Sequence, residues 1–551
     1  MKKVTRITAI LLMLAMCFAL AACGGKETQS PAAPSGSAPA APTTSVAPPA
    51  PTESANVMVP GEVIQAPEEP GVKYADLIRI NAELPVVVVD VMSQGATFSI
   101  MRQIFILIYD RLVHYYPDDG VYEGELATHW DTDDFKTWVF YLRDDVTFHN
   151  GDKFTSQDVV DTIGLAKEAV GSLGFDPWRN VESVRAVDEY TVEIVLTAVN
   201  ADFVHFISEA GGSIVNKAAR DADPIKGAWV GTGAFYVSDF VSDGYTELTR
   251  NENYWGTAPL TRQLYIQCVP EPAANTIMQL NGEVDVSLNI PPQDNDMFVE
   301  LDDYIVYGFA ANSTCSLTFG LLNPITSDLN FRLAVAHAVN REEIAIVSTG
   351  NWAKPTPDGA FWGDSTPFRN TGLVQREYDP ELAKEYLAAS SYNGEEVELM
   401  TGPSTLTIGA QMIYEQLVAI GINVRLFPTD IPTLVMGSQY GNENMQLLHF
   451  VSPFTVVASS ARVMLYPGMT ANRASYNNPR VNELLDKAPT VSRAEQEAIY
   501  MEIQELVYED IPQLSLYERI WSVVTNKNVG GIRIHPDMEH DHRGIFMTVD
   551  G

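Results

Sequence analysis

The chain has 551 residues, of which 46% are hydrophobic, and a formal net charge of −36 at neutral pH. This length allows two or three domains with sizeable cores. The excess of negative charge argues against nucleic acid or a bare anionic membrane as a partner, because both are polyanions themselves.

The first residues have the plan of a bacterial secretory signal. A basic start is followed by an apolar run from residue 7 to residue 20, and then by Ala21-Ala22-Cys23. The run is too short to span a bilayer and the small residues suit cleavage, so residues 1–22 are predicted to be removed. The pattern resembles a lipoprotein signal, which implies that Cys23 becomes the first mature residue and carries a lipid. The alternative is an ordinary signal cut elsewhere, with Cys23 present by chance.

The segment after Cys23 is rich in Pro, Ala, Ser, Thr and Gly and has few large apolar residues up to about residue 71. Such a composition cannot bury a core, so residues 23–71 are predicted to form a lipidated tether with a reach of roughly 40 Å. A loosely packed N-terminal subdomain is the alternative. No later apolar stretch approaches 18 residues, so we expect an extracytoplasmic protein that is held at the cell membrane through its lipid anchor only.

Two cysteines, Cys268 and Cys315, remain after processing and lipidation. The body is therefore not a disulfide-framework domain, although its compartment permits disulfides. Free thiols are favoured because a core of this size has no need of a covalent link, but spacing alone leaves the pairing open.

The first half of the body has the pattern of a β-rich region. Residues 138–148 alternate between apolar and polar positions around a turn at Asp144-Asp145, which predicts a strand pair. Thr155 is placed to cap a helix whose apolar positions fall on one face. Residues 181–196 have the pattern of a hairpin.

The second half alternates strands and helices. A short strand at residues 397–399, a helix at 408–420 and a strand at 422–426 predict a βαβ unit with a parallel pair. Further helix starts are indicated by three local signals. These are Asn340 with Glu343, Asn478 before Pro479, and Ser492 with Glu495. The body is therefore predicted to be α/β with at least two lobes.

An ordered set of motifs resembles the family 5 solute-binding proteins of ABC importers, which includes oligopeptide, dipeptide and nickel receptors. The matching segments cover nearly everything from about residue 76 to residue 535. They are YDRLV at 109–113, ELA at 125–127 with Trp130, FYLRDDVTFHNG at 140–151, TSQDV at 155–159, GTGAF at 231–235, RNENYW at 250–255, LNGEVD at 280–285, FRLA at 331–334 with Asn340-Arg341, GINV at 421–424, YNNP at 476–479 and IPQL at 511–514.

The resemblance implies a two-lobe periplasmic-binding-protein-like fold of the class II type, in the large cluster C form. Lobe I is expected over residues 72–316, with an extra β-rich subdomain at about 101–187, and lobe II over 317–511, after which residues 512–551 return to lobe I. The resemblance further implies a monomer without a cofactor or enzymatic activity. This monomer would capture a small solute, such as a peptide, in the interlobe cleft and deliver it to ABC permease subunits.

The identity of the solute is left open by one departure from the family pattern. Peptide receptors of this family commonly hold the ligand's α-ammonium group with an acidic residue after the strand that corresponds to residues 445–448. Residues 449–455 contain no carboxylate here. Because a buried cation without an anion is costly, either another acid substitutes or the ligand lacks a free amine.

Seven residues are the candidates for lining the cleft. They are Gln94, Trp352, Phe361, Trp362, His449, Phe450 and Arg462. The alternative for each aromatic residue is core packing. Arg462 is a candidate partner for a ligand carboxylate, with a surface salt bridge as its alternative.

A cluster near the C-terminus raises the alternative of a nickel or metal-chelate receptor. His535, Glu539, His540 and His542 have side chains that suit nickel or zinc. A solvated polar tail is favoured for this cluster, so no metal site is predicted. In nickel receptors of the family a chelator in the cleft generally holds the metal, so a cluster in the tail would not by itself indicate nickel uptake.

A cell-envelope hydrolase is the competing class. The chain has no G-x-S-x-G elbow, no H-E-x-x-H and no C-x-x-C. Three family-like segments are interpreted as structural. His149 is expected to be a hydrogen-bonded turn residue, Gly231–Gly233 does not complete a dinucleotide fingerprint, and Asn253–Trp255 is expected to be a packed loop corner.

Overall fold

The structure is a computed structural model of the chain. The structure describes residues 57–58, 63–67, 72–94, 99–116, 120–269, 271–288, 290–356, 358–363, 366, 368–402, 405–430, 433–434, 445–451, 457–469, 471–536 and 538–549. The expected signal, Cys23 and the tether up to residue 56 lie outside these residues. Within the described part of the chain, no helix is both long enough and apolar enough to cross a membrane.

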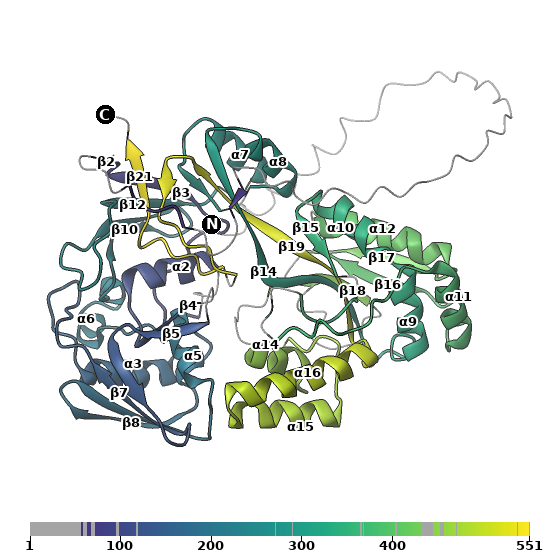
Figure 1. The fold of residues 1–551 in the computed structure, drawn as a ribbon, viewed down its shortest axis with the longest axis horizontal. Coiled ribbons are helices and arrows are strands. Elements are labelled where there is room, and N and C mark those ends of the chain that lie inside the picture. The colour runs from purple at the N-terminus through teal and green to yellow at the C-terminus, as the bar shows by residue number, and fades with distance from the viewer. Residues whose placement is uncertain are drawn as a thin grey trace, which may run out of the picture. The chain divides into compact units, whose positions relative to one another are not determined.

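A twelve-stranded mixed sheet runs through the body (Figure 1). Its order is β10 (Phe235–Val241), β11 (Tyr245–Arg250), β12 (Gln263–Gln267), β3 (Leu77–Asn81), β13 (Val286–Ser287), β19 (Gln513–Asn526), β14 (Tyr304–Phe319), β18 (Met445–Val451), β16 (Val397–Thr401) and β17 (Val424–Pro428). Two short strands pair off this path: β1 (Val57–Met58) with β14, and β15 (Ala353–Pro355) with β19.

The two long strands β14 and β19 pair antiparallel along most of their length (Figure 1). Their register shifts between Ala310 and Thr314 and again between Cys315 and Ser316. A shift of this kind bends a strand pair and re-aims its side chains.

The hydrophobic clusters divide the described residues into two bodies at these strands. One core contains residues from Ile78 to Ala311 and from Val523 to Ile545, and we call its body lobe I. Two adjoining clusters lie between Cys315 and Tyr517, and we call their body lobe II. The predicted two-lobe α/β architecture is therefore confirmed. The finer domain boundaries given above stay predictions.

The β-rich part of lobe I contains a four-stranded sheet and a hairpin. The sheet has the order β6 (Ala127–Asp131), β7 (Thr137–Leu142), β9 (Thr191–Leu196) and β8 (Val181–Asp188), and the hairpin joins β4 (Val113–Tyr116) to β5 (Val121–Gly124). A small sheet joins β2 (Lys73–Tyr74), β21 (Phe546–Val549) and β20 (Val529–Gly530). The predicted hairpin at residues 181–196 is confirmed by the β8–β9 pair.

The predicted pairing within residues 138–148 is wrong. Both edges of β7 are occupied by β6 and β9, and residues 146–148 contribute only the isolated bridge from Thr147 to Lys153. Alternation showed correctly that one face of β7 is buried, but alternation carries no information on which strand pairs with it.

Helices cover both lobes. Lobe I has α2 (Ser99–Ile108), α3 (Ser156–Glu168), α4 (Phe175–Trp178), α5 (Phe203–Ser208), α6 (Lys217–Ala222), α7 (Pro272–Leu280) and α8 (Pro292–Val299), with short 3₁₀ turns η1 (Ala210–Gly212) and η2 (Lys226–Trp229). Lobe II has α9 (Leu329–Ala338), α10 (Arg341–Thr349), α11 (Pro380–Ala389), α12 (Thr405–Ala419), α14 (Val457–Leu465), α15 (Pro479–Lys487), η4 (Ala488–Thr490) and α16 (Arg493–Asp510).

The local helix signals are confirmed. Thr155 forms a capping box with Asp158 at the start of α3, and Ser492 forms one with Glu495 at the start of α16. The side chains of Asn340 and Asn478 accept hydrogen bonds from the first turns of α10 and α15. The predicted βαβ unit is also present, because β16 and β17 are parallel and α12 connects them.

The end of the predicted tether packs on the body. Val57–Met58 pairs in parallel with β14, and Ile64 packs against the lobe I core.

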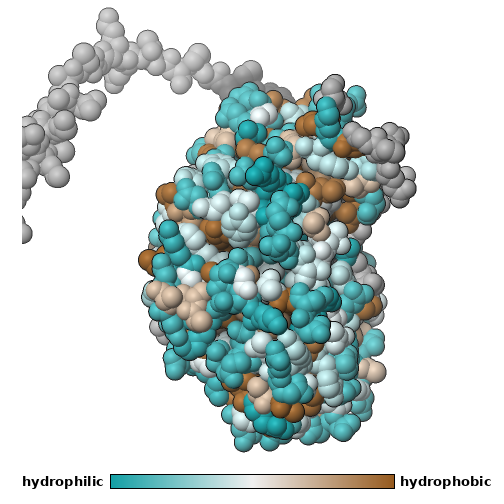
Figure 2. Space-filling view, turned by 90° about the vertical axis from the view of Figure 1, so that its left-hand side faces the viewer, coloured by the Kyte–Doolittle hydropathy of each residue, from teal (hydrophilic) through white to brown (hydrophobic). Residues whose placement is uncertain are grey.

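The surface in Figure 2 is mainly hydrophilic, with apolar residues scattered over it, which agrees with the acidic composition. Cys268 and Cys315 are both free thiols, as favoured from the sequence, and Cys315 is buried.

Candidate functional site

The ends of the parallel strands of both lobes meet where β14 and β19 pass from one lobe to the other. In lobe I, β3 runs parallel to β12 and β13, and the last residue of β13, Ser287, pairs with Val524. In lobe II, the last residue of β18, Val451, pairs with Ser313. Ligands in open α/β sheets bind outside the carboxyl ends of the strands. Residues 518–522 of β19 extend beyond the carboxyl end of β13, with β15 paired to residues 517–519, and therefore border the candidate site.

Arg519 lies on this segment of β19. Its guanidinium carbon lies 3.9 Å from the centre of the Trp521 ring, and alternation places both side chains on one face of the strand. Burial lowers the pKa of Arg519, and the nearby Glu83 opposes this shift. Glu83 follows β3, and burial raises its pKa, while the Ser99 hydroxyl donates a hydrogen bond to it at 3.4 Å.

The same face continues into the C-terminal segment. Trp521 pairs with Phe309 of β14, and the Phe309 ring contacts the His540 ring with 4.9 Å between the ring centres. His540 and the described residues next to it therefore lie beside the crossover strands on the side of Arg519.

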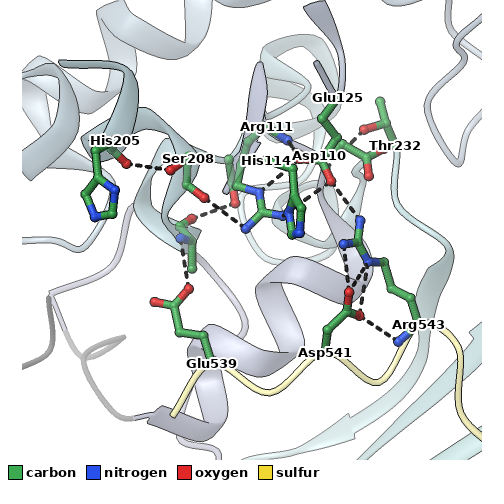
Figure 3. A network of polar contacts seen from close by, with 12 residues as sticks. Asp110, Arg111, His114, Glu125, His205, Ser208, Thr232, Glu539, Asp541 and Arg543 are labelled. Atoms are coloured by element: carbon green, nitrogen blue, oxygen red, sulfur yellow. Dashed lines mark hydrogen bonds and ion pairs between the residues drawn. The ribbon is translucent and has the colours of Figure 1, made fainter. Parts of the chain in front are cut away.

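A buried network of charged residues holds this C-terminal segment on lobe I (Figure 3). Glu125 accepts hydrogen bonds from Arg111 Nε at 3.0 Å and from Arg543 Nη1 at 2.7 Å. Arg543 also donates to Asp541 at 2.8 Å, and Arg102 donates to Glu539 at 2.8 Å. Despite burial, which acts in the opposite direction, Arg111 and Arg543 lower the pKa of Glu125 to about 2.

Asp110 joins the network to the loop at residues 253–255. Its two carboxylate oxygens accept hydrogen bonds from Tyr254 Oη at 3.2 Å and from Trp255 Nε1 at 2.8 Å. Burial and then the neighbouring charge of Glu125 raise the pKa of Asp110 to about 6. The expectation that this segment is a packed loop corner is confirmed. His149 is likewise a hydrogen-bonded turn residue, with Nε2 3.0 Å from the Gly233 carbonyl oxygen.

A small pocket opens beside this network. Its volume is about 20 Å³, which is enough for about one water molecule and too small for a solute. Arg111 donates to His114 Nδ1 at 2.8 Å, and burial keeps the pKa of His114 well below its ordinary value, so the neutral ring carries its proton on Nε2. The lining residues are Ile106, Arg111, His114, Tyr115, His205, Ser208, Glu209, His535, Glu539 and Asp541.

The expected solvated tail at the C-terminal cluster is wrong. His535, Glu539, His540 and His542 are all buried, because the described residues of this segment pack between α2 and the crossover strands. Burial holds the pKa of His540 well below its ordinary value and lowers that of His542 to about 4. Among the residues that the structure describes, no group of three or more His, Cys, Asp or Glu side chains is placed to hold a metal ion.

The residues that the sequence suggested as cleft-lining candidates lie in different parts of the structure. Gln94 is exposed, and its side-chain amide donates to the Val170 carbonyl at 2.7 Å. Trp352 packs on the opposite face of the crossover strands, where its Nε1 donates to Asp296 at 2.8 Å. Arg462 donates to Asp486 at 2.9 Å at the surface.

Two further pairs of candidates have different surroundings. Phe361 and Trp362 are buried in a lobe II cluster next to each other. His449 and Phe450 lie in β18 opposite Cys315 and Thr314 near the crossover, and their side chains are outside the described part of the structure. The role of all seven candidates in binding stays a prediction.

The lobes also touch away from the crossover strands. The Ala201 backbone N–H donates to the Pro489 carbonyl at 3.0 Å. Gln496 Nε2 on α16 donates to the two carboxylate oxygens of Asp202, at 3.1 Å and 3.2 Å. Burial raises the pKa of Asp202. The two lobes are therefore in contact at a second place besides the crossover strands.

Sequence reasoning missed Arg519 and Glu83. The signal for Arg519 was its place in Leu516-Tyr517-Glu518-Arg519-Ile520-Trp521, where charged residues interrupt an otherwise apolar strand. An interruption of this kind in a central strand requires a partner for the charge.

Comparison with known proteins gives one consistent result. The model of the family described as "Bacterial extracellular solute-binding proteins, family 5 Middle" matches residues 121–465. The nickel-binding periplasmic protein of Escherichia coli (strain K12) is 22% identical over 470 residues, covering 78% of this chain and 87% of that protein. The probable D,D-dipeptide-binding periplasmic protein DdpA of the same strain is 24% identical over 466 residues, covering 78% and 86%.

A solved structure agrees with the sequence matches. NikA from Brucella suis in complex with Fe(III)-EDTA has a TM-score of 0.76 and 20% identity, covering 85% of this chain and 99% of that one. The match confirms the predicted periplasmic-binding-protein-like fold. Since the family match spans more than half of the chain, this protein belongs to family 5 of the bacterial extracellular solute-binding proteins.

Proposed function

We propose that this protein is the lipid-anchored, extracytoplasmic receptor of an ABC importer and that it captures a peptide-like solute between its lobes. The observation that carries the proposal is the arrangement at β14 and β19, where the carboxyl ends of the parallel strands of both lobes converge. A ligand that contacts both walls of such a space favours the closed arrangement of the lobes.

The relatives support a solute of this class. One of them is named as D,D-dipeptide-binding and another as a peptide transport protein, while a third is named as nickel-binding. The receptor delivers its solute unchanged to permease subunits, and the lipid on Cys23 keeps it near them.

The experiment is to purify the mature protein in mild detergent, denature it and identify the released solute by mass spectrometry. Titration calorimetry with the identified compound then gives the stoichiometry. We expect one peptide-like molecule per chain and no product after prolonged incubation. Recovery of a metal chelate would favour the nickel-type alternative, and turnover of the compound would favour a cell-envelope hydrolase.

A further inference from the structure

The guanidinium group of Arg519 is largely enclosed by the protein, and it has no hydrogen-bond acceptor in the described part of the structure. A guanidinium group has five N–H donors and normally satisfies them when it is enclosed. The Nε atom of Arg519 is enclosed and has no partner among the described residues. Its contact is the stacking of the guanidinium on the Trp521 ring at 3.9 Å.

Other enclosed arginines of this chain show what a structural role looks like. Arg111 donates to Glu125, to His114 and to the Ser208 carbonyl. Arg332 donates to the carbonyl oxygens of Thr326 and Asp510. In each case the fold supplies the acceptors, whereas for Arg519 the described residues supply none.

Glu83 does not serve as the missing acceptor in this arrangement. It acts on Arg519 electrostatically, but the two side chains form no ion pair within 4 Å among the described contacts, and the hydrogen bond of the Glu83 carboxylate comes from Ser99. An unpaired charge in such surroundings costs stability, so its presence points to a partner beyond the described residues.

The position of Arg519 identifies that partner. The residue lies on β19 beyond the carboxyl end of β13, at the place where the strand leaves one lobe for the other. Stacking on Trp521 fixes the plane of the guanidinium group, and no described residue accepts a hydrogen bond from the Nε atom on its edge. A guanidinium edge matches a carboxylate through two parallel hydrogen bonds, which a lysine cannot reproduce.

We propose that Arg519 binds a carboxylate group of the solute. This inference rests on the proposed function and narrows the solute to compounds with a free carboxylate, such as peptides with an unmodified C-terminus. Arg519 thereby takes the role for which the sequence had nominated Arg462.

The test compares two probes on the mature protein in mild detergent. One is a mixed pool of dipeptides and tripeptides with free C-terminal carboxylates, and the other is the same pool with C-terminal amides. Native mass spectrometry and the shift in unfolding temperature report binding. We expect the wild-type protein to bind the free acids about 10- to 100-fold more tightly than the amides, because a hydrogen-bonded charge is lost in the amide.

Three variants assign the preference to the residue. Arg519→Gln is expected to remove the preference, and Arg519→Lys to keep only part of it, because the charge remains but the planar edge is lost. Arg480→Gln is the matched control, since Arg480 is exposed on α15 and pairs with Glu502 at 2.8 Å. Without peptide, Arg519→Gln is expected to unfold at a temperature no lower than the wild type, because no protein hydrogen bond is lost.

Four outcomes would overturn the proposal. Equal binding of both pools by the wild type, or an unchanged preference in Arg519→Gln, would overturn the role of Arg519 and leave the receptor function intact. A large drop in the unfolding temperature of peptide-free Arg519→Gln would show a structural role instead. Failure of the wild type to bind either pool would overturn the proposed function and the inference together.

Discussion

Replacing Glu125 by glutamine removes the acid that joins two arginines in the interior of lobe I. Glu125 accepts hydrogen bonds from Arg111 and Arg543, and these arginines lower its pKa from 4.5 to about 2. Each pKa unit corresponds to about 1.4 kcal/mol, so the ionised group contributes about 3 kcal/mol to stability at neutral pH. Breaking a buried ion pair by removing one partner typically costs about 3–5 kcal/mol. We therefore expect Glu125→Gln to lose about 3 kcal/mol at pH 7.

The pH dependence of this loss has a definite sign. The folded-state pKa of Glu125 lies below its unfolded value, so the contribution is fully present above pH 4.5 and is lost as the pH falls through about 2. The difference between wild type and Glu125→Gln is therefore expected to shrink to roughly half at pH 3.

Urea unfolding followed by tryptophan fluorescence measures both values. Glu123→Gln is the matched control, because Glu123 is exposed two residues away, and it is expected to change stability by less than about 0.5 kcal/mol. A loss below about 1 kcal/mol for Glu125→Gln at pH 7, or the same loss at pH 3, would refute the reasoning.

Three further changes test other parts of the structure. Thr155→Ala removes the capping box with Asp158 and is expected to cost about 1 kcal/mol in urea unfolding; no loss would contradict the cap. Glu209→Gln is expected to have the same melting temperature as the wild type near pH 4 and a higher one at pH 8. Burial raises the pKa of Glu209, so the stability of the wild type falls as the pH rises above 4.5. A difference in melting temperature that does not depend on pH would contradict this. Gln496→Ala removes the hydrogen bonds to Asp202 across the lobes and is expected to weaken solute binding about 5- to 10-fold in calorimetry; unchanged affinity would show that the contact does not support closure.

Local features of the fold could be predicted from the sequence. The caps at Thr155, Asn340 and Ser492 depend on residues within one helical turn, so their spacing in the chain is sufficient to find them. The βαβ unit at residues 397–428 was predictable for the same reason, because its strand, helix and strand follow one another directly.

The partners of the charged residues could not be predicted, because they come from distant parts of the chain. Arg102 meets Glu539, and Glu125 meets Arg543, through the return of the C-terminal segment to lobe I. A histidine- and acid-rich stretch near a chain end has the composition of an exposed tail, so the burial of His535, Glu539, His540 and His542 was missed. Arg519 was missed because its significance lies in the absence of an acceptor among the described residues.

The central claim is that two lobes close around a solute, and an interlobe distance tests it most directly. Unnatural amino acids at Val187 of lobe I and Glu497 of lobe II, both exposed, can carry spin labels without use of the native thiols. Pulsed electron paramagnetic resonance then gives the distance between the two spin labels with and without the free-acid peptide pool. The account predicts a broad, longer distribution without peptide that becomes narrow and shorter when peptide is added. A single distribution that peptide leaves unchanged, while peptide binding is shown by calorimetry, would contradict it.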